Sequence, residues 1–129
     1  MNPLSLMYVA FGGAFGSMCR YIISDGISRF NATGFPLGTL TVNIIGSFLL
    51  GVWLAVAATM EPGKAKDLNL LFAVGALGGF TTFSTFTLDA YMLMERGLHI
   101  QAFFYVFGSI MISVFGLIAG MWLMKVSLG

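Results

Sequence analysis

Residues 78–87, Gly-Gly-Phe-Thr-Thr-Phe-Ser-Thr-Phe-Thr, lie inside an uncharged run of sequence that covers residues 68–88. Glycine and hydroxyl residues are poor helix formers, because glycine loses the most backbone entropy and hydroxyl side chains compete for backbone hydrogen bonds. A break inside a membrane helix frees backbone groups that are tolerated only within protein or around a bound ion. We therefore predict a helix that is broken in the middle of the membrane. The alternative is a continuous helix whose hydroxyls bond back to its own carbonyls.

Three further uncharged runs accompany this segment, and the chain as a whole is 58% hydrophobic and only 9% charged. Soluble domains carry about 25% charged residues, whereas a spanning helix needs about 20 apolar residues. We therefore predict a single all-α integral membrane domain over residues 1–129. Its four transmembrane helices are expected at residues 4–24, 37–58, 68–94 and 100–124.

Several classes of function conflict with this composition. The net charge of +1 argues against nucleic acid as a partner. Cys19 is the only cysteine, which rules out an intrachain disulfide and a cysteine-ligated zinc site. The only histidine, His99, lies in a connection, so no nucleophile, base or metal cluster of the kind an enzyme needs is present. We expect a protein that is not an enzyme.

The basic residues are balanced between the two sides that four spans would define. Lys/Arg asymmetry between short loops orients membrane proteins, and here each side carries three basic residues. This balance favours dual topology, in which chains insert both ways and pair as an antiparallel homodimer. The alternative is that other features set one orientation weakly. One side holds Lys64, Lys66 and Lys125, and the other holds Arg20, Arg29 and Arg96.

Small residues recur at the spacing that lets membrane helices approach closely. Three Gly-x-x-x-Gly pairs and one Ser-x-x-x-Gly pair occur within the predicted spans. Because such pairs are common, we expect most of them to serve packing within one chain. They are Gly12 and Gly16, Gly75 and Gly79, Gly116 and Gly120, and Ser47 and Gly51.

Polar side chains also follow one face of two predicted helices. Thr39, Asn43 and Ser47 are spaced at i, i+4 and i+8, and Ser109 and Ser113 at i and i+4. Interhelical hydrogen bonding is the more common role of such hydroxyls. Asn43 is more informative, since its amide offers two donors and an acceptor. The pattern indicates a polar track that would stabilise a ligand through dipoles alone.

Aromatic and basic residues refine this hypothesis. Phe83 and Phe86 follow the predicted break at i and i+3, a spacing that usually indicates packing, although the positive edge of a phenyl ring also suits an anion. Arg20 is expected near a helix end, where it would reach the interface, steer anions or join a structural hydrogen-bond network. No lysine or arginine is expected in the middle of a span.

Three motifs, in order along the chain, resemble the Fluc (CrcB) family of fluoride channels. The resemblance implies an antiparallel dual-topology homodimer with two pores and a structural Na⁺ at the dimer interface. It also implies export of fluoride from the cytoplasm through a bacterial inner membrane, which lowers fluoride toxicity. The motifs are Gly12-x-x-x-Gly16-x-x-x-Arg20-Tyr21, Gly38-Thr39-Leu40-x-Val42-Asn43-x-x-Gly46 and Gly78-Gly79-x-Thr81-Thr82-Phe83-Ser84-Thr85-Phe86.

The same resemblance assigns roles to residues. The backbone carbonyls of Gly78 and Thr81 from both subunits would hold the Na⁺. Arg20 and Asp89 would have vestibule or structural roles, but Asp89 stands where the family usually has a glutamate, which weakens its assignment. The fluoride path would comprise Asn43, Phe83 and Phe86, with Thr39, Ser84, Thr85, Tyr105, Ser109 and Ser113 along the track.

Two other membrane functions compete with this assignment. A small dual-topology multidrug or cation transporter needs a carboxylate within the membrane, yet all five acidic residues lie at span ends or in connections. An accessory membrane subunit stays open as an alternative, because composition alone does not demonstrate transport.

Overall fold

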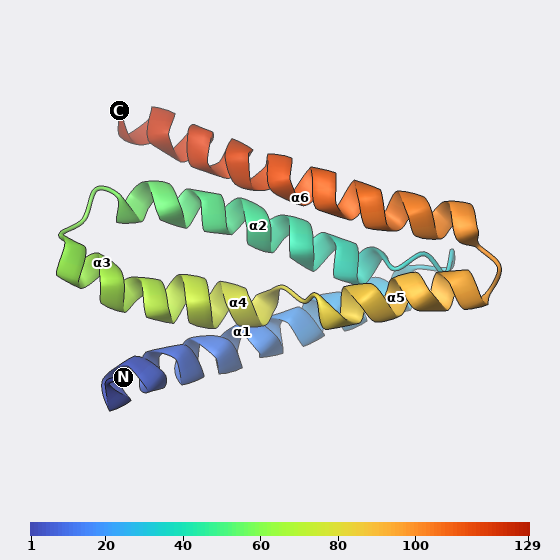
Figure 1. Cartoon of the computed structure of the whole chain (residues 1–129), viewed down its shortest axis with the longest axis horizontal. Coiled ribbons are helices and arrows are strands. Elements are labelled where there is room, and N and C mark those ends of the chain that lie inside the picture. Colours follow the sequence, from blue (N-terminus) through green and yellow to red (C-terminus); the bar gives the residue numbers. More distant parts are fainter.

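The computed structural model describes all 129 residues, and every regular element in it is helical. This result confirms the predicted all-α architecture with four long, apolar segments suited to crossing a membrane. Both termini lie at the same end of the molecule (Figure 1). The elements are α1 (Pro3–Phe30), α2 (Leu37–Ala57), α3 (Pro62–Asn69), the π-helix η1 (Leu70–Leu77), α4 (Gly78–Phe80), α5 (Ser84–Glu95) and α6 (His99–Leu128).

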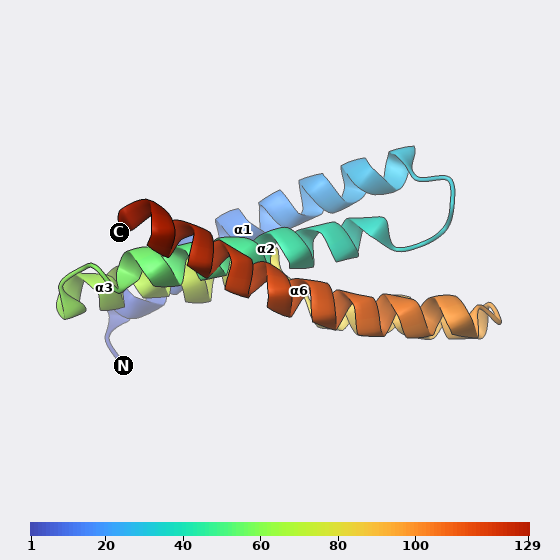
Figure 2. The ribbon, with the colours of Figure 1, turned by 90° about the horizontal axis from the view of Figure 1, so that it is seen from above.

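The third segment, which runs from α3 to α5, changes its packing partner along its length. Its first part, η1 and α4, packs on α1, whereas α5 packs on α6. Helix α2 packs mainly on α6 and also contacts α1 and η1. Figures 1 and 2 show this order from two sides.

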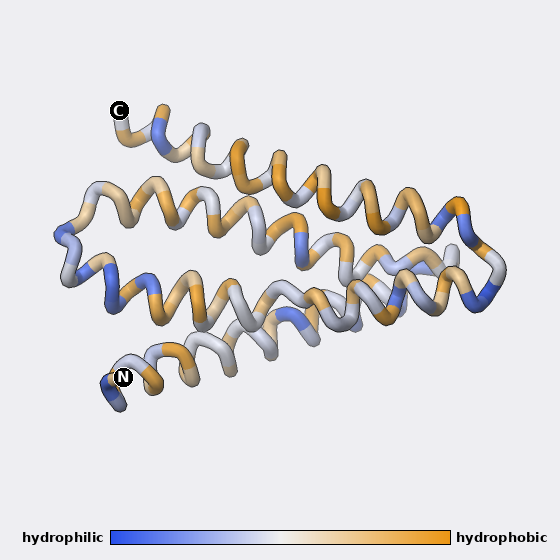
Figure 3. The backbone as a smooth tube through the Cα atoms, in the orientation of Figure 1, coloured by the Kyte–Doolittle hydropathy of each residue, from blue (hydrophilic) through white to orange (hydrophobic).

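Most of the molecular surface is apolar. Only 17 of the 129 residues are buried, and large hydrophobic side chains are exposed along all four segments. Hydrophilic residues gather mainly at the ends of the helices (Figure 3). Exposed hydrophobic side chains along the helices, with hydrophilic residues at the helix ends, are typical of a lipid-facing surface. The buried core is small and lies between α5 and α6, where it comprises Phe86, Ala90, Leu93, Ala102 and Tyr105.

The first helix is longer than the predicted range 4–24, since α1 continues to Phe30. Arg29 forms an ion pair with Asp25 one turn earlier, at 2.9 Å, and Ser28 Oγ donates to the carbonyl of Ser24 at 2.8 Å. An i, i+4 ion pair of this kind stabilises a helical turn that carries charge. As a result Arg20 lies inside α1, well before its end, so the prediction that placed it near a helix end was wrong.

The other helix limits differ by smaller amounts. The third segment begins at Pro62 instead of residue 68, because proline at the first helical position is favourable and the charged turn of α3 lies exposed. It ends at Glu95, one residue beyond the predicted range. Helix α2 ends at Ala57 rather than residue 58, and α6 extends from His99 to Leu128 rather than from 100 to 124.

Regular helix is interrupted between α4 and α5. Helix α4 ends at Phe80 and α5 begins at Ser84. Thr81 between them has extended backbone, with φ −85° and ψ 160°. The ribbon in Figure 1 leaves its helical path at this point. Residues 81–83 are called the break below.

Glycines set the distance between α1 and the first part of the third segment. A Cβ atom at Gly12 would overlap the carbonyl oxygen of Leu71, and one at Gly16 would overlap that of Ala76. Gly51 and Gly120 likewise bring α2 and α6 together. These glycines therefore serve packing within one chain, as expected for most of them. Gly116 is an exception, because its nearest contact is an ordinary 3.7 Å.

Candidate functional site

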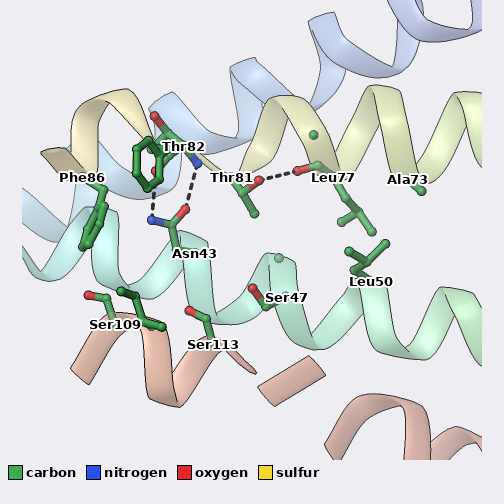
Figure 4. Close-up of a pocket in the computed structure, with 14 residues that line it drawn as sticks. Asn43, Ser47, Leu50, Ala73, Leu77, Thr81, Thr82, Phe86, Ser109 and Ser113 are labelled. Carbon is green, nitrogen blue, oxygen red and sulfur yellow. Dashed lines mark hydrogen bonds between the residues drawn. The ribbon is translucent and has the colours of Figure 1, made fainter. Parts of the chain in front are cut away.

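A cavity of about 320 Å³ lies where α2, the third segment and α6 meet, directly beside the break (Figure 4). It brings together seven of the residues predicted to hold an ion or line a path. It also contains seven residues outside that set. The predicted residues are Asn43, Gly78, Thr81, Phe83, Phe86, Ser109 and Ser113, and the added ones are Gly46, Ser47, Leu50, Ala73, Leu77, Thr82 and Ile110.

Asn43 fastens the break to α2. Its Nδ2 donates to the carbonyl oxygen of Thr82 at 3.0 Å, and its Oδ1 accepts from the Thr82 N–H at 2.8 Å. The side-chain amide thus satisfies both backbone groups of a residue that has left the helix, where unpaired groups are costly. One N–H of the amide has no role in this pair, so Asn43 retains a donor beside the cavity.

The carbonyls of Gly78 and Thr81 lose their usual helical donors at the break. In a helix each carbonyl accepts from the N–H four residues later. The Thr82 N–H, which would serve Gly78, donates to Asn43 instead. The Thr85 N–H, which would serve Thr81, donates to Thr82 Oγ1 at 3.2 Å. Both residues with freed carbonyls line the cavity.

A third carbonyl at this level, that of Gly79, has a side-chain partner. Arg20 Nε on α1 donates to it at 2.9 Å, and Arg20 is half-buried. This hydrogen bond is the kind of contact that the structural role considered for Arg20 requires.

Serine residues line the cavity from two helices. Ser109 on α6 is 5% exposed, and its Oγ is buried without a hydrogen-bond partner. Ser113, one turn later, and Ser47 on α2 also line the cavity (Figure 4). Ser47 belonged to the polar stripe seen in the sequence but not to the predicted site. Its i+4 spacing from Asn43 was the signal that could have placed it there.

The two phenylalanines after the break have different surroundings. Phe86 is 7% exposed and belongs to the core, whereas Phe83 is 76% exposed. Their ring centroids are 5.7 Å apart and their planes tilt by 51°. The spacing i, i+3 therefore keeps the rings in contact but does not bury both of them within one chain.

Four residues of the predicted path lie outside the cavity: Thr39, Ser84, Thr85 and Tyr105. Tyr105 is fully buried and packs on Phe86, with ring centroids 5.3 Å apart. Its hydroxyl donates to Asp89 Oδ2 at 3.0 Å. Thr39 is buried, Thr85 is half-buried and Ser84 is exposed.

Acidic and metal-binding groups are scarce here. None of the cavity residues carries a carboxylate, an imidazole or a thiol. No group of three or more His, Cys, Asp or Glu side chains in the chain could hold a metal ion. The ligands that the cavity does offer are neutral oxygens and amide or hydroxyl donors.

Comparison with known proteins gives a consistent match over almost the whole chain. The family described as "CrcB-like protein, Camphor Resistance (CrcB)" matches residues 7–121. A protein of Phocaeicola vulgatus named "Fluoride-specific ion channel FluC" is 37% identical over 92% of this chain and 97% of its own length. Proteins with the same name from Rhizobium johnstonii and Chelativorans sp. are 41% and 42% identical, over 95% and 93% of this chain and 97% and 95% of their own lengths.

Proposed function

Because the chain belongs to the CrcB-like family, we propose that it is a fluoride channel that releases fluoride from the cytoplasm through a bacterial inner membrane. It is a multi-pass membrane protein with four long apolar helices. The family is one of ion channels and not of enzymes. The observation in this chain that best supports the proposal is the cavity at the break, where a buried serine hydroxyl has no partner.

The groups that line this cavity suit a small, strongly hydrated anion. A pore must replace the hydration shell with donors while it leaves the ion free to depart. Ser109, Ser113 and the uncommitted N–H of Asn43 supply neutral donors. The ring edges of Phe83 and Phe86 add a weak positive field. The lining holds no carboxylate to repel an anion and no lysine or arginine to trap it.

A structural Na⁺ belongs to the same proposal. The carbonyls of Gly78 and Thr81 lack their helical donors, and neutral oxygens without a nearby carboxylate fit a hard monovalent cation. Two carbonyls from each of two chains would form a four-oxygen site. When bound, the ion would neutralise carbonyl dipoles that otherwise repel one another.

The site needs a second copy of the chain to be enclosed. Phe83 is exposed although it lines the cavity, and the break lies open beside it. An antiparallel partner would cover this face and give two pores by symmetry. The balance of basic residues is slightly weaker support than the sequence suggested, because Arg20 lies inside α1. Without Arg20, the number of basic residues near the helix ends is three on one side and two on the other. They are Lys64, Lys66 and Lys125 on one side, and Arg29 and Arg96 on the other.

Fluoride efflux tests the function. The purified protein alone, reconstituted in liposomes loaded with fluoride, should release fluoride rapidly once the membrane potential is clamped. Matched liposomes loaded with chloride should retain their ion. Fluoride release no faster than from protein-free liposomes would refute the channel and leave an accessory role.

Orientation can be tested separately. Two lysines added to the connection at residues 59–61 should bias insertion to one side. This variant should be inactive alone and regain efflux when it is coexpressed with an oppositely biased partner. Full efflux from a population with a single orientation would contradict the antiparallel dimer while leaving the fluoride channel intact.

A further inference from the structure

Arg20 is an unusual residue for its position. It lies on α1 at the level of the break and donates to the Gly79 carbonyl. The only ion pair within 4.0 Å in the chain joins Arg29 to Asp25, so Arg20 has no carboxylate partner. A cation buried in a membrane protein is costly and is retained where it pairs or serves a function.

Close backbone packing fixes the reach of Arg20. A Cβ at Gly79 would lie 2.6 Å from the carbonyl oxygen of Gly13 and 3.0 Å from Ser17 Oγ. Gly79 therefore lies directly on α1, about one helical turn from Arg20. An exposed and mobile lysine or arginine side chain could reach several hydrogen-bond acceptors. Here the backbones hold the guanidinium against one carbonyl.

The Gly79 carbonyl is one of those at the break that a regular helix would satisfy. Its helical partner would be the N–H of Phe83, which lies outside the helices. Arg20 supplies the missing donor, while the carbonyls of Gly78 and Thr81 lose their donors and face no such side chain. The guanidinium therefore occupies the Gly79 carbonyl, which lies between these two in the sequence.

We propose that Arg20 is a positioning residue for the cation site: by holding the Gly79 carbonyl against α1, it leaves the carbonyls of Gly78 and Thr81 oriented as the free ligands. The inference rests on the Na⁺ of the proposed function. It differs from anion steering, because the contact is a hydrogen bond to backbone and not an open positive surface.

The test compares Arg20→Met, which removes donor and charge at similar length, with Arg20→Lys, which keeps the charge. Arg29→Met is the matched control, since Arg29 lies on the same helix in an exposed ion pair. Thermal stability of each purified dimer is measured against Na⁺ concentration, with choline as the replacement cation. Hydrogen exchange of residues 81–83 is measured in the same samples.

In Arg20→Met, the Na⁺ concentration for half-maximal stabilisation should rise at least tenfold, and amides of the break should exchange at least tenfold faster. Arg20→Lys should lie between this variant and the wild type, because a flexible ammonium reaches the carbonyl without fixed geometry. Arg29→Met should match the wild type. If Arg20→Met does not fold, the same shifts in Arg20→Lys decide.

A folded Arg20 variant with wild-type Na⁺ dependence and wild-type exchange would overturn the proposal. An efflux defect that becomes smaller at high ionic strength, without a change in Na⁺ dependence, would assign Arg20 to anion steering. This result would overturn the proposal as well. A wild-type protein that Na⁺ does not stabilise would refute the cation site itself. This result would also overturn the positioning role of Arg20, because that role is defined by the cation site.

Discussion

The two halves of the third segment are held in different ways. Before the break, η1 and α4 lie on α1 through backbone contacts at Gly12, Gly16 and Gly75. After the break, α5 lies on α6 through the side chains of Phe86 and Leu93. The first half is thus packed through backbone contacts at glycines, and the second half is packed through large side chains.

This difference explains why the segment breaks where it does. A straight helix would follow one neighbour, whereas a segment that changes from α1 to α6 must change direction. The residues between the halves must then find partners for their backbone groups, and Arg20 and Asn43 supply them. Gly78 and Thr81, whose carbonyls are left without helical donors, line the cavity. In this chain the polar site lies where the third segment changes its packing partner.

The largest effect is expected where backbones touch. Gly16→Ala should destabilise the protein by about 3 kcal/mol, at the upper end for overpacking, because the new Cβ overlaps the Ala76 carbonyl. Gly26→Ala on the same helix meets nothing within 4 Å and should stabilise by up to about 1 kcal/mol. Unfolding in a denaturing detergent measures both. Equal effects of the two substitutions on stability would contradict the view that backbone contacts with α1 hold the first half of the third segment.

The aromatic half should respond in function more than in stability. Phe86→Ile and Phe83→Ile should each cost under about 1.5 kcal/mol of stability. If the rings stabilise the ion, each should lower fluoride efflux at least tenfold. Phe103→Ile changes an exposed ring elsewhere, on α6, and is the control. Wild-type efflux from both Phe83→Ile and Phe86→Ile would show that the two rings serve packing only.

The smallest effect is expected at the buried hydroxyl. Ser109→Ala should slow efflux by about two- to tenfold, the equivalent of one hydrogen bond of about 0.5–1.5 kcal/mol. Stability should stay constant or rise, because Ser109 Oγ has no partner within the chain. Ser127→Ala removes an exposed hydroxyl and serves as the control. A loss of stability with unchanged efflux would make Ser109 a structural residue.

The sequence predicts most of the fold because lipid contact imposes a simple pattern. Uncharged runs located all four segments, and the Gly-Gly and hydroxyl run at residues 78–87 pointed to the interruption. Helix ends were less accurate, since exposed charged turns such as Asp25–Arg29 are stabilised by local pairs and carry no apolar signal.

The site was predictable by residue type but not by partner. Residue spacing placed Asn43 on a polar face, yet nothing in the spacing shows that its amide pairs with Thr82, 39 residues away. The same holds for Arg20 and Gly79. The place of Gly46 at the cavity was visible only in the fold. A Cβ atom at Gly46 would overlap the methyl group of Thr81.

The central claim is that the polar groups fastened at the break form the path of the anion. Asn43→Asp loses the donor to the Thr82 carbonyl and adds a negative charge beside the cavity. Two like charges about 4 Å apart repel by about 4 kcal/mol at an effective dielectric constant of 20. Asn69→Asp is the matched control, since its oxygen still accepts from Trp53 Nε1.

The decisive measurement is the initial rate of fluoride efflux from liposomes that contain the wild type or either variant, with folding and assembly checked by gel filtration. We expect Asn43→Asp to lower the rate at least a hundredfold and Asn69→Asp to stay near the wild type. Wild-type efflux from a folded Asn43→Asp protein would contradict the account, because the anion would then have to cross the protein elsewhere.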